Sequence, residues 1–185
     1  MNRETVRALC QLNTEFYERN AASFSQTRTA PWEGWRRCMA ACGFDDSDEA
    51  LGQSMDTQIA DSVLDIACGN LRFEAFLANT YPHVDWSFFA VDNCEPLVAS
   101  GQEDIAKKVH FTCEDIVSNL LDGLSAAEPA NTPAFAAATP FDLVVSFGFL
   151  HHIPSFDLRQ QFLLEALSQV KPGGYLVVSF WQFLN

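Results

Sequence analysis

Five short apolar runs, separated by helix-like stretches, dominate the chain from residue 63 onward. The runs are rich in β-branched and aromatic residues and are bounded by turn residues, which is typical of buried strands. Strands that alternate with helices predict an α/β fold, with parallel strands joined by right-handed crossovers. The predicted strands are VLDIA (63–67), WSFFAVD (86–92), VHFTC (109–113), FDLVVSF (141–147) and YLVVSFW (175–181).

The stretches between these runs predict helices. Two other segments, residues 43–60 and 125–140, have no periodic apolar face. We expect the first to be a connector before the first strand and the second to be a surface loop before the fourth strand. The predicted helices of this region span Leu71 to Asn79, Glu95 to Lys107, Asp115 to Leu124 and Asp157 to Val170.

The first 20 residues predict an amphipathic helix. Val6, Leu9, Leu12 (or Asn13) and Phe16 recur near helical spacing, and we expect this face to pack on the sheet domain. A second helix is predicted from about Trp32 to Ala41, after Pro31. The chain therefore divides into an N-terminal helical arm and connector, 1–60, and a sheet domain, 61–185.

Composition narrows the class of protein. The chain has 185 residues and is 48% hydrophobic, which suits one ordered domain. No apolar run approaches the roughly 20 residues of a membrane-spanning helix, and the first residues do not form a secretory signal. Six cysteines are scattered through predicted helices and strands, which is typical of reduced thiols in a cytoplasmic protein. The net charge of -13 argues against a broad surface for phosphate backbones.

The segment VLDIACGNLRFEAFL (63–77) carries the sharpest chemical signal. A predicted strand contains Asp65, a tight turn contains Gly69, and a helix follows at once. Such a turn lets backbone N–H groups and a helix N-terminus approach a ligand closely. Ala67 and Leu71 replace the first and third glycines of a GxGxxG run. Because a dinucleotide pyrophosphate needs a very close backbone, these replacements weigh against NAD.

Two further carboxylates follow strand ends. Asp92 ends FFAVD, 23 positions after Gly69, where it can accept hydrogen bonds from ribose hydroxyls; the alternative is a solvated loop carboxylate. Asp115 in CEDI (113–116) can accept from an exocyclic amine such as adenine N6, with Ile116 packing on the ring; the alternative, which is compatible with it, is a helix N-cap. In VKPGGYLVVSFW (170–181), the Lys-Pro-Gly-Gly run predicts a sharp turn into the last strand.

These pieces, in the order LDxxCGN, strand-end Asp, EDI, FDLVVS…HHI and VKPGGYLVVS, resemble a class I S-adenosylmethionine-dependent methyltransferase over residues 63–181. The resemblance implies a Rossmann-like, doubly wound parallel sheet with strand order 3-2-1-4-5. It implies S-adenosyl-L-methionine as the cofactor and S-adenosyl-L-homocysteine as the product. By the same resemblance, Asp65, Ala67, Cys68 and Gly69 surround the methionine part of the cofactor, Asp92 with Asn93 holds the ribose, Asp115 with Ile116 holds adenine, and Ser146, Phe147 and Gly148 lie beside the transferable methyl group.

The segment FYERNAASFSQTRTAPW (16–32) is similar to the opening of the tRNA wobble-uridine carboxymethyl methyltransferases and their bacterial relatives. That similarity implies an arm that lies over the cofactor. Arg28 would pair with the cofactor's carboxylate, and Tyr17 would add a hydroxyl group. The alternatives are a structural salt bridge for Arg28 and a purely core-filling role for Trp32.

The chemistry implied by the family asks little of the protein beyond alignment. The sulfonium of the cofactor is an activated methyl donor, so the protein has to hold a nucleophile in line with it. A base is needed only where the nucleophile must lose a proton. His151 and His152 are the neighbouring groups expected to titrate near neutrality, and one of them can instead position the loop. We expect Cys68 to pack rather than react.

The sequence therefore predicts a methyltransferase that acts on a small molecule or a modified nucleoside. The arm suggests tRNA, but the acidic charge argues against it. Two alternatives are a cofactor-binding module or regulatory subunit without its own activity, and a nicotinamide-dependent oxidoreductase, which Ala67 and Leu71 disfavour. The resemblance implies two further strands beside the fifth, which we expect this sequence to lack. We expect a truncated chain with impaired activity, or a partner that covers the open edge of the fifth strand.

Overall fold

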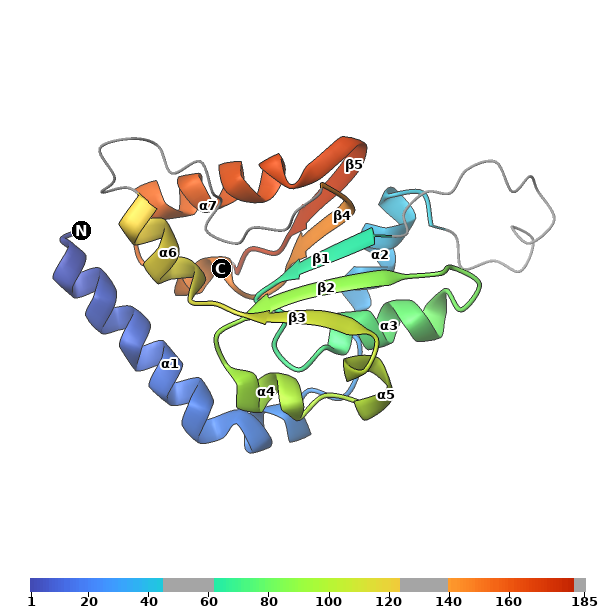
Figure 1. Ribbon diagram of the computed structural model, residues 1–185, viewed down its shortest axis with the longest axis horizontal. Coiled ribbons are helices and arrows are strands. Elements are labelled where there is room, and N and C mark those ends of the chain that lie inside the picture. Colours follow the sequence, from blue (N-terminus) through green and yellow to red (C-terminus); the bar gives the residue numbers. More distant parts are fainter. Residues whose placement is uncertain (45–61, 124–139, 182–185) are drawn as a thin grey trace.

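A five-stranded parallel sheet forms the centre of the protein (Figure 1), with strand order β3-β2-β1-β4-β5. The computed structural model describes residues 1–44, 62–123 and 140–181. The α/β fold and the strand order expected from the sequence are confirmed, whereas the predicted connector and surface loop lie almost wholly outside the described residues. The strands are β1 (Ser62–Ile66), β2 (Ser87–Asp92), β3 (Val109–Cys113), β4 (Phe141–Ser146) and β5 (Val170–Val178).

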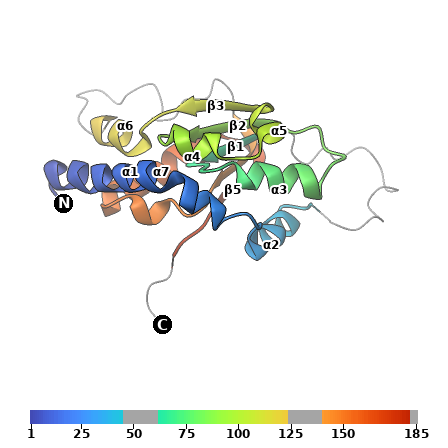
Figure 2. The ribbon, with the colours of Figure 1, turned by 90° about the horizontal axis from the view of Figure 1, so that it is seen from below.

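Helices cover both faces of the sheet (Figure 2). Side chains alternate between the two faces of a strand. Val63 of β1 accordingly packs in a cluster with α2 and α3, whereas Leu64 and Ile66 pack with α6 and α7. Burial on both faces explains why the central strands β1 and β4 read as continuous apolar runs. The helices are α2 (Glu33–Ala41), α3 (Arg72–Thr80), α4 (Glu95–Ala99) and α5 (Glu103–Ala106) on one face, and α6 (Ile116–Gly123) and α7 (Phe156–Ser168) on the other.

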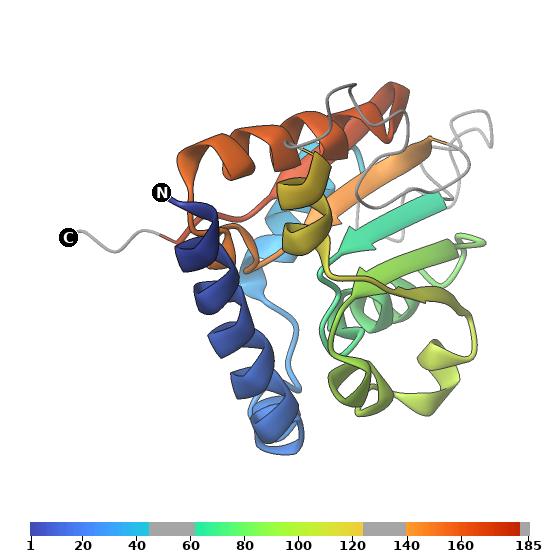
Figure 3. The same cartoon turned by 60° about the vertical axis from the view of Figure 1, so that its left-hand side comes forward.

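Helix α1 (Arg3–Gln26) runs across the ends to which the strand arrows point (Figure 3) and contacts α4 and α6. The predicted helix is confirmed, but most of its predicted packing face is wrong. Val6 is buried, whereas Leu12 and Phe16 are 63% and 55% exposed, and Leu9 is also exposed. Part of the inner face carries polar side chains that border a cavity, while Val6 and Ala21 pack in apolar clusters. No helix in the described ranges is long and apolar enough to cross a membrane.

One predicted helix is interrupted. The stretch Glu95 to Lys107 forms two short helices, α4 and α5, with Gly101 between them. A Cβ atom at Gly101 would lie 2.6 Å from the carbonyl oxygen of Asn70, in the β1–α3 loop. The missing side chain therefore lets the α4–α5 turn press against that loop, and a continuous helix is not formed.

The last strand is longer than predicted and begins earlier. The Lys-Pro-Gly-Gly run lies inside β5 rather than in a turn before it, since Val170 already pairs with Phe141. The register then shifts between Phe141 and Leu143, as in a β-bulge. Gly173 has the positive φ (84°) that the sequence suggested, but it uses this conformation for the irregularity. Strand β5 ends at Val178, not at residue 181.

Candidate active site

A cavity of about 720 Å³ lies at the carboxyl ends of the strands, bordered by α1, α3 and the segments that follow β1 to β4. We call it the carboxyl-end cavity. Ligand sites of open parallel sheets lie at this edge. Of the residues that the sequence predicts for the site, all except Ser146 border it. They are Tyr17, Arg28, Asp65, Ala67, Cys68, Gly69, Asp92, Asn93, Asp115, Ile116, Phe147, Gly148, His151 and His152.

Three residues of the β1–α3 loop have a left-handed backbone, and one of them is glycine. Ala67 and Leu71 have φ values of 64° and 57°, and Gly69 lies between them at 59°. Non-glycine residues rarely adopt this left-handed region, because Cβ approaches the following carbonyl oxygen. The backbone N–H of Ala67 donates to the carbonyl oxygen of Val91 over 2.8 Å, which ties the loop to the end of β2. Ala67 and Leu71 therefore hold a backbone conformation that favours glycine.

Asp92 joins the β1–α3 loop to the segment after β2. Its Oδ2 accepts from the N–H of Gly69 and its Oδ1 from the N–H of Cys94, both over 2.9 Å. The side chain is 9% exposed, so the alternative of a solvated loop carboxylate is wrong. Burial raises its pKa, while these backbone hydrogen bonds lower it. Each oxygen keeps a lone pair that can accept from a ligand hydroxyl.

Asp115 is the N-cap of α6. Its Oδ1 accepts from the N–H of Ser118 over 3.1 Å, and its Oδ2 accepts from the hydroxyl group of the same serine over 2.8 Å. The N-cap alternative is thus confirmed, and the carboxylate also borders the carboxyl-end cavity beside the buried Ile116. Nearby, the side-chain amide of Asn93 donates to the hydroxyl oxygen of Thr14 over 3.1 Å, which fixes the end of β2 to α1.

The two histidines lie in the 3-10 turn η2 (Leu150–His152) after β4. Nε2 of His152 lies 3.0 Å from the hydroxyl oxygen of Tyr17, and the His151 and His152 rings are 3.9 Å apart. Burial, with a smaller contribution from His151, lowers the pKa of His152 to about 4. Burial also lowers the pKa of His151. The expectation that these groups titrate near neutrality is therefore wrong for His152, which is a neutral, weak base at pH 7.

Ser146 does not border the carboxyl-end cavity, so its expected position there is corrected. It is completely buried, and its hydroxyl group donates to the carbonyl oxygen of Ile66 over 2.9 Å. This hydrogen bond joins the end of β4 to the end of β1. The next residues, Phe147 and Gly148, do border the cavity.

Two buried carboxyl groups lie beneath the β1–α3 loop, and the sequence analysis identified only one of them. Asp65 is 2% exposed and Glu74 of α3 is 0% exposed. Oδ1 of Asp65 and both carboxyl oxygens of Glu74 lack a hydrogen-bond partner in the described part of the chain. Burial and the neighbouring Glu74 raise the pKa of Asp65, and burial raises that of Glu74 to about 8. The sequence signal that could have indicated Glu74 is its place among the apolar residues of the predicted helix, where the buried side chains of α3 lie.

Cys68 lies beside these carboxyl groups and is also buried. Burial, followed by the negative charges of Glu74 and Asp92, raises the pKa of its thiol well above 9.0. A thiol in this environment stays protonated at neutral pH and is a poor nucleophile. This agrees with the expectation that Cys68 packs rather than reacts.

Two arginines border the carboxyl-end cavity, and the sequence predicted a role for one of them. The guanidinium carbon of Arg28 lies 3.9 Å from the ring centroid of Phe24, and Nη1 donates to the hydroxyl oxygen of Thr27 over 2.9 Å. No ion pair to a carboxylate forms at Arg28 or Arg72 in the ranges that the structure covers. The structural salt bridge considered for Arg28 is therefore not found there. Other cavity residues that sequence reasoning missed are Asn13, Thr14, Asn70, Arg72, Glu114 and Trp181.

Comparison with known proteins decides the family. A model of the methyltransferase domain matches residues 63–174, which is more than half of the chain. The chain belongs to the methyltransferase-domain family. The matched region runs from within β1 into β5 and contains the loop with Ala67 and Leu71 and the carboxylates that border the carboxyl-end cavity. No curated protein sequence matches this chain.

Solved structures share the fold of this methyltransferase domain at low sequence identity. A DhpI–SAM–HEP complex has a TM-score of 0.57 and 18% identity, over 95% of this chain and 66% of that chain. A DhpI–SAH complex has a TM-score of 0.55 and 18% identity, over 91% and 67% of the two chains. A TehB-like SAM-dependent methyltransferase from Corynebacterium glutamicum has a TM-score of 0.50 and 18% identity, over 89% and 77%. This chain thus spans about two thirds of the DhpI chains.

Proposed function

We propose that this methyltransferase domain binds S-adenosyl-L-methionine in the carboxyl-end cavity and directs its methyl group to a small-molecule acceptor. The observation that carries the proposal is the convergence on one cavity of the β1–α3 loop, two strand-end carboxylates and Arg28. These groups fit the cofactor. The two carboxylates can accept hydrogen bonds from its hydroxyl and amine groups, and the guanidinium can pair with its carboxylate. Oδ1 of Asp65 also fits, as a buried acceptor that has no partner among the described residues.

Each part of the cofactor has a group to hold it in this proposal. Asp92 accepts from the ribose hydroxyls with Asn93 beside it, and Asp115 accepts from the adenine amine while Ile116 packs on the ring. Arg28 pairs with the carboxylate. The remaining residues surround the methionine part, and they are Tyr17, Asp65, Ala67, Cys68 and Gly69.

The residues of the chain position the reactants and keep them from water. When bound, S-adenosyl-L-methionine supplies an activated methyl group on a sulfonium, so alignment is the main requirement. Phe147 and Trp32 border the cavity beside the end of β4, and their rings lie 6.2 Å apart. His152 is held by Tyr17 and has a pKa of about 4, so its role in this scheme is to position rather than to remove a proton.

A small molecule is the acceptor that the charge favours. The chain carries 24 acidic and 11 basic side chains, and this balance repels a polyanion. The similarity of the arm to tRNA wobble-uridine carboxymethyl methyltransferases supports a second candidate, the carboxyl group of a modified tRNA nucleoside. Arg28 and Tyr17 of that arm border the cavity. A cofactor-binding subunit without its own activity is the alternative from another class.

Calorimetry tests the cofactor first. We expect S-adenosyl-L-homocysteine to bind, and NAD to bind at least about tenfold more weakly, a difference of about 1.4 kcal/mol. Absence of S-adenosyl-L-homocysteine binding would contradict the proposal. Transfer of a labelled methyl group to a panel of small organic acids, and to tRNA in parallel, then separates the candidates. Binding without transfer to any acceptor would favour the silent module.

A further inference from the structure

Side chains of both charges border the carboxyl-end cavity. Asp92, Glu114 and Asp115 come from the ends of β2 and β3, whereas Arg28 and Arg72 come from the arm and from α3. The proposed function uses one guanidinium, that of Arg28, for the one carboxylate of the cofactor. The guanidinium of Arg72 is then left without an anionic partner.

Arg72 is held in place with no counter-charge among the residues that the structure describes. Its guanidinium carbon lies 5.2 Å from the ring centroid of Trp32 and 5.1 Å from that of Trp35. Nη1 donates to the carbonyl oxygen of Ala30 over 3.0 Å, but the buried Nε–H has no acceptor among the described residues. Burial and the charge of Arg28 both lower the pKa of Arg72. Two cations kept together in a chain of net charge -13 form a site suited to an anion.

The surface beside Arg72 is aromatic. The Trp32 ring is stacked on Trp35 at 5.4 Å and meets Phe147 edge-on at 6.2 Å. A Cβ atom at Gly148 would lie 3.4 Å from Trp32 and 3.9 Å from Nε1 of Trp181, so the glycine keeps the space between the two tryptophans open. These rings offer flat apolar contact to a ligand whose charged group reaches Arg72.

We propose that Arg72 binds the anionic group of the methyl acceptor, and that the acceptor is a small organic acid with a flat apolar body. The inference rests on the proposed function and names its substrate class. Arg72 is a specificity-determining residue in this scheme: its planar fork matches a carboxylate or a phosphate, while Trp32 and Phe147 contact the apolar part.

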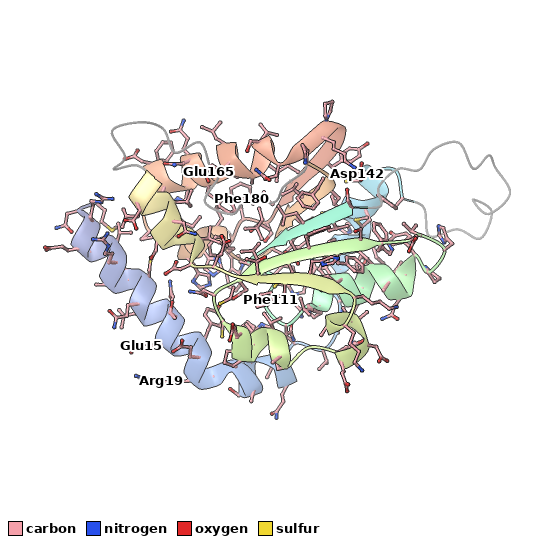
Figure 4. The ribbon with its side chains drawn as sticks, in the orientation of Figure 1. Glu15, Arg19, Phe111, Asp142, Glu165 and Phe180 are labelled. Carbon is pink, nitrogen blue, oxygen red and sulfur yellow. The ribbon has the colours of Figure 1, made fainter. Side chains whose placement is uncertain are left out.

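The test uses protein saturated with S-adenosyl-L-homocysteine, so that Arg28 is already engaged. Phenylacetate, phenyl phosphate and the neutral phenylacetamide are titrated, with tryptophan fluorescence as the readout because Trp32 and Trp35 contact Arg72. We expect both anions to bind at least about tenfold more tightly than the amide. Arg72→Gln should abolish this preference, and Arg72→Lys should restore part of it. Arg19→Gln is the matched control, since Arg19 pairs with Glu15 on the outer side of α1 (Figure 4) and should leave the preference unchanged.

The outcomes separate this inference from the function on which it rests. If the wild-type protein does not bind S-adenosyl-L-homocysteine, the proposed function fails. If it binds S-adenosyl-L-homocysteine but shows no preference for the anions, the inference alone is overturned. It is also overturned if the anions compete with S-adenosyl-L-homocysteine for binding. The same holds if Arg72→Gln lowers the affinity for S-adenosyl-L-homocysteine as much as the affinity for the anions, because Arg72 would then bind the cofactor's carboxylate.

Discussion

The hydroxyl oxygen of Tyr17 and Nε2 of His152 lie 3.0 Å apart, which joins the middle of α1 to the turn after β4. Their rings also meet edge-on at 5.5 Å. The two residues are 135 positions apart in sequence, so this contact fixes the arm over the carboxyl-end cavity. Both side chains are half-buried, which makes the hydrogen bond costly to lose.

Tyr17→Phe should therefore loosen the arm without emptying the core. We expect the free energy of unfolding to fall by about 1 kcal/mol, because His152 loses its partner while the ring contacts remain. Urea denaturation measures the change. Tyr175→Phe on the exposed side of β5 is the control and should change stability little. Equal effects of the two substitutions would show that the Tyr17 hydroxyl contributes nothing specific.

Asp92→Asn should impair ligand binding and stability together. An amide cannot accept from the N–H groups of Gly69 and Cys94 at the same time, so one buried N–H is left unsatisfied, at a cost of about 1–3 kcal/mol. If Asp92 also holds the ribose, affinity for S-adenosyl-L-homocysteine should fall at least about tenfold. Calorimetry with the exposed Asp85→Asn as control checks this. Wild-type affinity in Asp92→Asn would rule out the ribose assignment.

Ala67→Gly should stabilise the protein. Ala67 has a φ of 64°, where an L-residue is strained by roughly 1–2 kcal/mol, and glycine removes that strain. Because glycine also has greater freedom in the unfolded chain, we expect a net gain of about 0.5–1 kcal/mol. Ala78→Gly, inside α3, is the matched control and should destabilise by about 0.5–1 kcal/mol. A loss of stability in both variants would contradict the strain assigned to the loop.

Glu74→Gln should change how stability depends on pH. The pKa of Glu74 is about 8 in the folded state against an ordinary value of 4.5, so the folded protein holds a proton that the unfolded chain releases between these values. Its contribution to the free energy of unfolding therefore falls as pH rises from about 4.5 to 8.

His152 acts in the opposite direction, since its pKa is lowered from 6.5 to about 4 and stability is lost as pH falls through that window. The range from pH 6.5 to 8 thus isolates Glu74 from His152. Urea denaturation across it should show a smaller decline in Glu74→Gln than in the wild-type protein. Parallel curves for the two proteins would contradict the raised pKa.

The sequence predicted the sheet well because burial on both faces leaves a strong signal. Val63, Leu64 and Ile66 are all completely or almost completely buried, so β1 reads as an apolar run. The strand order followed from the family resemblance rather than from periodicity. The Lys-Pro-Gly-Gly run was misplaced because a bulge and a turn require the same positive φ at glycine.

The face of α1 was misjudged for a different reason. Leu12 and Phe16 form the apolar stripe that periodicity detects, yet they face outward, while Thr14 and Tyr17 face the carboxyl-end cavity. Hydrophobic periodicity shows where apolar side chains recur, and it predicts a packing face only if the apolar face is the buried one. A helix that lines a cavity with polar side chains does not meet that condition. The sequence did not indicate Arg72 or Glu74. Arg72 contacts tryptophans that are distant in sequence, and the carboxyl oxygens of Glu74 have no hydrogen-bond partner among the described residues.

Acidic groups from the ends of β2 and β3 and basic groups from the arm and α3 border the carboxyl-end cavity, and together they act on a ligand that approaches it. Consider a ligand that is negative at one end and rich in hydrogen-bond donors at the other. It is attracted when its negative end approaches the arginines, and it is repelled in the reverse orientation. Selection between the two orientations then begins at a distance, before any hydrogen bond has formed. Added salt shortens that distance, because the Debye length falls to roughly 8 Å at physiological ionic strength.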